Sequence, residues 1–121
     1  MSIWLRRIYD EPTRNDGQRV LVDRIWPRGV SKKKAQIDHW LKEVAPSSDL
    51  RKWFGHDPEK WEGFKDRYFK ELDSRPEAIE SLLERVHRGR VTLVYGAKEE
   101  RYNNAVALRE FLNAALSSGK P

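Results

Sequence analysis

The 121-residue sequence contains no cysteine, and this absence excludes several kinds of chemistry at once. Without thiols the chain cannot form disulfides, use a cysteine nucleophile or hold zinc or an iron–sulfur cluster through sulfur. Long apolar runs are also missing, so we expect no membrane-spanning segment and no secretory signal at the amino terminus. Together these absences favour a cytoplasmic protein.

Motifs for known chemistry are scarce as well. The three histidines, His39, His56 and His87, are not spaced as metal ligands, and no complete catalytic motif occurs. We therefore expect neither a metal nor a cofactor. The sequence leaves open whether the protein is an enzyme, and it does not specify an oligomeric state.

What the chain does contain is charge and aromatic surface. Charged residues make up 36% of the sequence, while five tryptophans, four tyrosines and four phenylalanines supply large groups for a core. We therefore expect a folded protein with a heavily charged surface. A chain of this length is ordinarily one domain, so residues 1–121 are predicted to form a single domain.

The positive charge is concentrated in one stretch. The net charge is +5, and six cationic residues fall between Arg19 and Lys34, where Asp23 is the only acidic residue. This stretch could contact an anionic partner such as a nucleic acid. Alternatively, the three consecutive lysines at its end could simply form the solvated start of a helix.

Three short apolar segments are predicted strands, with helical patterns between and after them. The strands are Ile3–Tyr9, Val20–Trp26 and Val91–Tyr95. The apolar runs in the last two are typical of strands buried on both faces, and a long helical stretch separates them. We predict that these two are parallel neighbours in an α/β protein of three layers, with a small, mostly parallel sheet flanked by helices.

One helix is predicted from apolar spacing alone. Ile37, Trp40, Leu41 and Val44 follow the i, i+3, i+4, i+7 pattern of an amphipathic helix that ends before Pro46.

Other helices are predicted from their caps. Asp57 precedes a proline and caps the start of a helix, and Ser74 and Glu77 resemble a capping box. Asn103 or Asn104 caps the last helix.

Two polar clusters follow the predicted parallel strands. Ligands are expected beyond the carboxyl ends of such strands, where both clusters fall. The clusters are Asp23, Arg24, Trp26 and Arg28, and then Tyr95, Lys98, Arg101, Tyr102, Asn103 and Asn104. The cationic members, Arg24, Arg28 and Lys98, could hold a phosphate, sulfate or carboxylate group together with free amides at the start of the last helix.

Asp23, His56 and Tyr95 are the candidates for proton transfer at such a site. Each candidate residue also has a structural alternative. Asp23 could have a purely structural role in a salt bridge with an arginine. Trp26 could belong to the core, and the two asparagines could be helix caps without a role in binding. His56 lies in a loop next to a capping aspartate, and that aspartate already has a structural role.

Several stretches resemble a known family. They are Asp23–Gly29 (DRIWPRG), Leu50–Asp57 (LRKWFGHD), Trp61–Phe64 (WEGF) with Tyr68, and Val91–Lys98 (VTLVYGAK). The sequence resembles the YeaO-like branch of the family known as domain of unknown function 488, over nearly its whole length. The resemblance implies a small bacterial or archaeal cytoplasmic α/β protein with three layers and no established activity.

The resemblance has two limits. Longer relatives carry cysteines near the last strand, which this chain lacks, so no thiol chemistry transfers. Some relatives are labelled transcriptional regulators, but no pair of helices with a recognition face is predicted here.

Three functions follow as hypotheses. The first is binding of, or action on, a small anionic or phosphate-bearing ligand at the carboxyl edge of the sheet. The second is nucleic-acid binding through the Arg19–Lys34 stretch, with Trp26 stacking on a base. The third is an interaction module for another protein, without catalysis.

Overall fold

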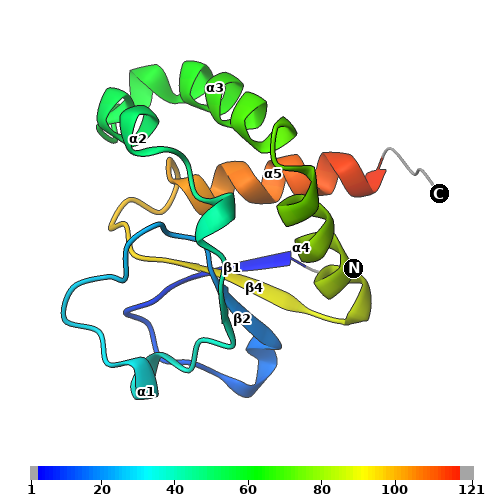
Figure 1. Ribbon diagram of the computed structural model, residues 1–121. Helices are drawn as coiled ribbons and strands as arrows, with labels where there is room; N and C mark the ends of the chain where they lie inside the picture. Colours follow the sequence, from blue (N-terminus) through cyan, green and yellow to red (C-terminus); the bar gives the residue numbers. More distant parts are fainter. Residues whose placement is uncertain (1–2, 118–121) are drawn as a thin grey trace.

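Short parallel strands form a sheet that brings distant parts of the chain together (Figure 1). The structure is a computed structural model that describes residues 3–117. Within these residues the strands are β1 (Ile3–Arg7), β2 (Gln18–Leu21), β3 (His39–Trp40) and β4 (Val91–Tyr95). Their order across the sheet is β1-β4-β2-β3, and every neighbouring pair is parallel. The predicted α/β class with a small parallel sheet is confirmed.

Strand β4 lies between β1 and β2, and all five of its residues are buried. Leu93 pairs with Leu5 on one side and with Val20 on the other. An apolar run with no alternation suits this position because both faces of a central parallel strand are covered. The prediction that β2 and β4 are parallel neighbours is confirmed, although β2 ends at Leu21 and Trp26 lies in the loop that follows.

The longer helices cover one face of the sheet, as Figure 1 shows. They are α2 (Ser48–Phe54), α3 (Trp61–Asp73), α4 (Pro76–Arg88) and α5 (Asn104–Ser117). Leu93 and Tyr95 of β4 point into the core beneath these helices, together with Phe64, Tyr68 and Leu108.

The second face is covered more thinly, by the single-turn helix α1 (Lys32–Ala35) and the loops beside it. Ile8, Leu21 and Val94 form its apolar centre with Ala35. Lys32–Lys34 are exposed, as expected for a solvated helix start, and Ser31 caps that turn by accepting from the Lys34 amide at 3.3 Å.

The helix predicted through Ile37 and Val44 is wrong. His39 and Trp40 form β3, and Lys42–Val44 is a 3-10 turn, η2. The apolar spacing arises because the segment runs along the edge of the sheet and packs side chains on both faces. Ile37 and Trp40 pack on the second face, whereas Leu41 and Val44 pack on the face under the long helices. The amides of Asp38 and Leu41 donate to the β2 carbonyls of Arg19 and Leu21, both at 2.9 Å, and only the 3-10 turn that follows has hydrogen bonds within the segment.

The predicted caps have mixed outcomes. Asp57 accepts from the Glu59 amide at 3.0 Å, but it caps a 3-10 turn, η3 (Pro58–Lys60), that leads into α3. Ser74 does not form a capping box, because its hydroxyl donates to the Glu71 carbonyl at 2.6 Å and Arg75 occupies the cap position of α4. Asn103 does cap α5, by accepting from the Val106 amide at 3.0 Å.

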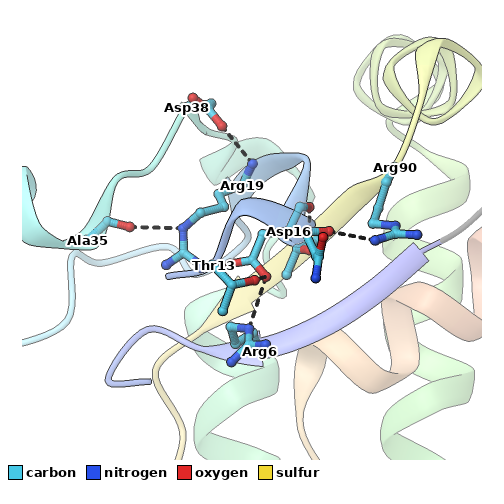
Figure 2. A network of polar contacts seen from close by, with 9 residues as sticks. Arg6, Thr13, Asp16, Arg19, Ala35, Asp38 and Arg90 are labelled. Atoms are coloured by element: carbon cyan, nitrogen blue, oxygen red, sulfur yellow. Dashed lines mark hydrogen bonds and ion pairs between the residues drawn. The ribbon is translucent and has the colours of Figure 1, made fainter. Parts of the chain in front are cut away.

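A buried ion pair holds the loop before β2 against the second face of the sheet. Figure 2 shows Asp16 between Arg6 of β1 and Arg19 of β2. Its carboxylate lies 2.7 Å from Arg19 Nη1 and 3.2 Å from Arg6 Nε, and both Asp16 and Arg19 are 3% exposed. Thr92 of β4 donates to the Asp16 carbonyl at 2.7 Å. Asp16 therefore links β1, β4 and β2 on one face.

The turn into β2 requires glycine. Gly17 has φ of +66°, and a β-carbon at this position would lie 2.3 Å from the Arg90 carbonyl oxygen. Arg90 in turn donates to the Asn15 carbonyl at 2.8 Å. The loop is therefore fixed between the ion pair and the residue that precedes β4.

Leu93→Ala tests the central position of β4. Because Leu93 is fully buried, the substitution should lower the free energy of unfolding by about 2–5 kcal/mol. Urea denaturation followed by tryptophan fluorescence measures the loss. Ile25→Ala is the control, since Ile25 is 64% exposed and its truncation should cost less than about 0.5 kcal/mol. Equal effects of the two would place Leu93 outside the core.

Asp16→Asn tests the ion pair. Burial alone would raise the pKa of Asp16, but hydrogen bonds from Thr13 and Arg19 and the charge of Arg6 outweigh it and hold the pKa below its usual value. The ionised form is thus stabilised by folding, and this stabilisation is lost as pH falls through the folded-state pKa. The variant should lose about 3 kcal/mol at neutral pH and show a smaller loss of stability on acidification than the wild type.

Denaturation midpoints near pH 7 and near pH 3 supply this comparison. Asp66→Asn, on the exposed side of α3, is the matched control and should behave as the wild type at both values. An acid-induced loss of stability that is the same in Asp16→Asn and the wild type would contradict the role of Asp16.

Candidate functional site

Asp23 lies where β2 and β4 both end. It follows β2 by two residues, and its Oδ2 accepts from the amide of Gly96 at 2.9 Å, directly after β4. Gly96 leaves little room there, because a β-carbon on it would lie 3.1 Å from Asp23 Oδ2. The carboxylate is therefore held at the carboxyl edge of the sheet, as the strand pattern predicts.

Asn104, the first residue of α5, completes the surroundings of this carboxylate. Its Nδ2 donates to the Val22 carbonyl at 3.0 Å and to Asp23 Oδ1 at 3.3 Å. The amide group thus donates to the loop directly after β2, while Asn104 Oδ1 has no hydrogen-bond partner among residues 3–117. Asn104 therefore contacts the Asp23 carboxylate, while Asn103 beside it is the helix cap.

The pKa of Asp23 is raised, and burial is the main cause. Hydrogen bonds from Gly96 and Asn104 and the charge of Arg51 act in the opposite direction but do not cancel it. Asp23 therefore differs from Asp16, since a polar cluster without a contacting cation surrounds its carboxylate.

Two adjoining hollows open above Asp23. The first, of about 170 Å³, is lined by Asp23, Arg24, Ile25, Pro46, Arg51, His56, Ala97 and Asn104. The second, of about 270 Å³, is lined by Pro46, Arg51, Lys52, Phe54, His56, Phe64, Asn103 and Asn104. They share Pro46, Arg51, His56 and Asn104, and we call them together the carboxyl-edge hollow.

Arg51 and His56 come from α2 and the loop that follows it. Gly55 ends the helix in the left-handed conformation, and His56 has a positive φ of 59° as well. Such a backbone is uncommon outside glycine and is strained, so it occurs where the surroundings determine it. The His56 ring packs 5.8 Å from the Phe54 ring, which leaves the exposed imidazole at the hollow.

The segment that leads into α2 is hydrogen-bonded to side chains of α3 and of Arg75, the residue before α4. Glu71 accepts from the Ser47 amide at 2.9 Å and from its hydroxyl at 2.6 Å, while Ser47 also caps α2. Tyr68 donates to the Val44 carbonyl, and Arg75 donates to the Ala45 carbonyl at 2.7 Å. These bonds determine where α2 begins and hence where Arg51 lies.

The residues proposed from sequence occupy different places. Arg24 lines the hollow, and its guanidinium also makes long bonds to the carbonyls of Pro46 and Ala45, at 3.4 and 3.5 Å. Arg28 and Lys98 are exposed and are not among the residues that line the hollow.

Trp26 and Tyr95 face other surroundings. Trp26 donates to the Val30 carbonyl at 2.9 Å and packs edge-on against Trp40, 5.5 Å between ring centres, on the second face. Tyr95 belongs to the core under the long helices, and burial raises its pKa, so its hydroxyl stays protonated.

Sequence reasoning missed Arg51, which is the cation that acts on Asp23. The signal was weak, because Arg51 looks like any exposed helical arginine. The adjacent Gly55 and His56 were a better clue, since a helix that ends in a glycine and then a histidine places nearby polar groups at a loop.

The arrangement offers acceptors, cations and an imidazole, but no evident nucleophile. Within residues 3–117, no three His, Asp or Glu side chains are grouped so that they could hold a metal ion. In the same part of the chain, none of the helices has the length and apolar character needed to cross a bilayer. Asp23 and His56 are the groups of the hollow that could move a proton.

The fold and the hollow define a small parallel α/β protein with a polar site at the carboxyl edge of its sheet. The family model described as "Inactive DUF488-N3 subclade" matches residues 2–120, and the chain therefore belongs to this family, DUF488-N3i. The predicted resemblance is confirmed.

Curated relatives support the same assignment. The uncharacterized protein YeaO of Escherichia coli (strain K12) is 36% identical over 94% of this chain and 99% of its own length. The uncharacterized proteins Mb3100c of Mycobacterium bovis and Rv3073c of Mycobacterium tuberculosis (strain H37Rv) are each 40% identical, over 88% of this chain and 90% of theirs. No solved structure matches the chain.

Arg51→Ala tests the electrostatics of the site. Removing the guanidinium removes a charge that favours the ionised carboxylate, so the pKa of Asp23 should rise further. Carbon-detected NMR of the Asp23 carboxyl group measures the titration midpoint. Arg51→Lys keeps the charge and should leave the midpoint close to that of the wild type. A midpoint that does not move in Arg51→Ala would show that the two groups do not interact.

Proposed function

We propose that this protein binds a small anionic ligand in the carboxyl-edge hollow and does not transform it. One observation carries the proposal: Asp23, Arg51, His56 and Asn104, from three separate segments of the chain, line one hollow. Parallel α/β proteins bind ligands at this edge, because loops from several strands meet there. Polar groups that converge on a hollow are the usual sign of a ligand site.

Arg51 is suited to hold the anion. Arg51 is exposed, and the hydrogen bond from its guanidinium to Ser48 Oγ is long at 3.5 Å. Most of its donors are therefore available to a phosphate or carboxylate, which a guanidinium binds through two parallel hydrogen bonds. Lys52 and His56 add donors at the same opening.

Binding without catalysis is supported by the chemistry of the lining. The hollow holds no serine, threonine or cysteine that His56 or Asp23 could activate. Tyr95 does not line the hollow, and burial raises the pKa of its hydroxyl. The family's description as inactive agrees with this proposal.

The basic stretch remains a second candidate, for nucleic acid. Lys32–Lys34 are exposed on α1, and Lys32 Nζ lies 5.8 Å from the centre of the Trp26 ring. Base stacking on Trp26 is less favourable, because the indole already packs on Trp40 and donates to Val30. Any contact through this stretch would be chiefly electrostatic.

Titration calorimetry with inorganic phosphate tests the proposed function. Arg51→Ala should weaken phosphate binding by about tenfold or more, because charge-assisted hydrogen bonds to the anion are lost. Arg88→Ala is the control: this exposed arginine ends α4, at the opposite edge of the sheet. Its affinity for phosphate should match the wild type.

Two results would contradict the proposal. Equal affinities of Arg51→Ala and the wild type would exclude the hollow as the anion site, and a loss in Arg28→Ala instead would move it to the other face. Salt-dependent binding of single-stranded DNA that is lost when Lys32–Lys34 are replaced by alanine would favour the nucleic-acid candidate.

A further inference from the structure

We infer that the ligand of the carboxyl-edge hollow is a small hydroxylated phosphate monoester of the sugar-phosphate kind, with its hydroxyl groups on Asp23 and Asn104 and its phosphate toward Arg51. The inference rests on the proposed function, and it adds an orientation and a ligand class. It follows from the distribution of hydrogen-bond donors and acceptors over the hollow.

The floor of the hollow consists of acceptors. Both oxygens of Asp23 accept hydrogen bonds, Oδ2 from the Gly96 amide and Oδ1 from Asn104 Nδ2, which is the pattern of an ionised carboxylate. The bond to Oδ1 is long, at 3.3 Å, so this oxygen can accept another. Asn104 Oδ1 has no partner among the described residues. A bound group that displaces water from these atoms should therefore present O–H or N–H donors to the floor.

The opening of the hollow consists of donors. Arg51 and Lys52 are exposed cations there, and His56 holds its imidazole beside them. Arg24 also lines the smaller hollow, but its guanidinium donates to the carbonyls of Pro46 and Ala45. The exposed charges of Arg51 and Lys52, together with the imidazole, suit a doubly charged phosphate better than a single carboxylate. The negative end of the ligand thus faces outward, away from the Asp23 carboxylate, which would repel it.

The side walls of the hollow limit the size and polarity of the part of the ligand between its phosphate and its hydroxyl groups. Pro46 and Ala97 border the smaller hollow, and Phe54 and Phe64 border the larger one. The volumes, about 170 and 270 Å³, accommodate a short carbon skeleton but not a polymer. A bare anion would leave the acceptors on the floor unpaired, and an alcohol without an anion would leave Arg51 unpaired.

Three probes separate these possibilities: methyl phosphate, ribose 5-phosphate and ribose. Methyl phosphate has the anion without free hydroxyl groups, and ribose has hydroxyl groups without the anion. We expect ribose 5-phosphate to bind the wild type at least about tenfold more tightly than methyl phosphate, and ribose to bind more weakly than either phosphate. Titration calorimetry at constant pH and salt gives the affinities.

Variants assign each end of the ligand. Asp23→Asn keeps the shape of the side chain but replaces an acceptor by a donor, so the preference for ribose 5-phosphate over methyl phosphate should fall toward one. Asn104→Ala removes the second acceptor and should act in the same direction. Arg51→Ala should weaken both phosphates by similar factors and keep the preference. Thermal melts confirm that each variant is folded.

The outcomes distinguish the inference from the proposed function. Equal binding of methyl phosphate and ribose 5-phosphate by the wild type would overturn the inferred orientation and leave anion binding intact. No binding of any phosphate would overturn both. A preference that survives in both floor variants would also overturn the inference, because the hydroxyl groups would then lie elsewhere.

Discussion

The pairing of β4 with both β1 and β2 is the constraint on which the rest of the structure depends. Strands this short gain little from one neighbour, and β4 is the strand that joins the first part of the chain to the last. The same pairing brings Asp23 to the Gly96 amide and so creates the floor of the hollow. Because the partners are far apart in sequence, the entropy lost in closing this long loop must be offset by burial, which the apolar character of β4 supplies.

Two aspartates near β2 show how surroundings separate structure from function. Asp16 contacts two arginines and accepts from Thr13, and its pKa is lowered. Asp23 accepts from two amide groups without a contacting cation, and burial raises its pKa. The charge of Asp16 is neutralised by the two arginines, and the ion pairs stabilise the fold. The second keeps part of its capacity to accept hydrogen bonds, which is the condition for recognising a ligand.

A hollow of this kind agrees with a family described as inactive. Recognition requires that donors and acceptors match those of the ligand, whereas catalysis also requires a group that reacts or stabilises a transition state. In the proposed function, Arg51, His56, Asp23 and Asn104 would meet the first requirement. The bonds from Glu71 and Arg75 to the segment before α2 maintain their geometry, so residues outside the hollow also contribute to it.

The sequence by itself determined the features that depend on neighbouring residues. The apolar run of β4, a cap at Asn103 or Asn104, and the polar clusters near the carboxyl ends of β2 and β4 all follow from local patterns. Only the tertiary structure decided that His39 and Trp40 form a strand, since apolar residues buried on two faces of a sheet can imitate one helical stripe. It also decided that Arg51 acts on Asp23 while Arg28 lies apart, because contacts between distant segments depend on how the helices pack and not on spacing along the chain.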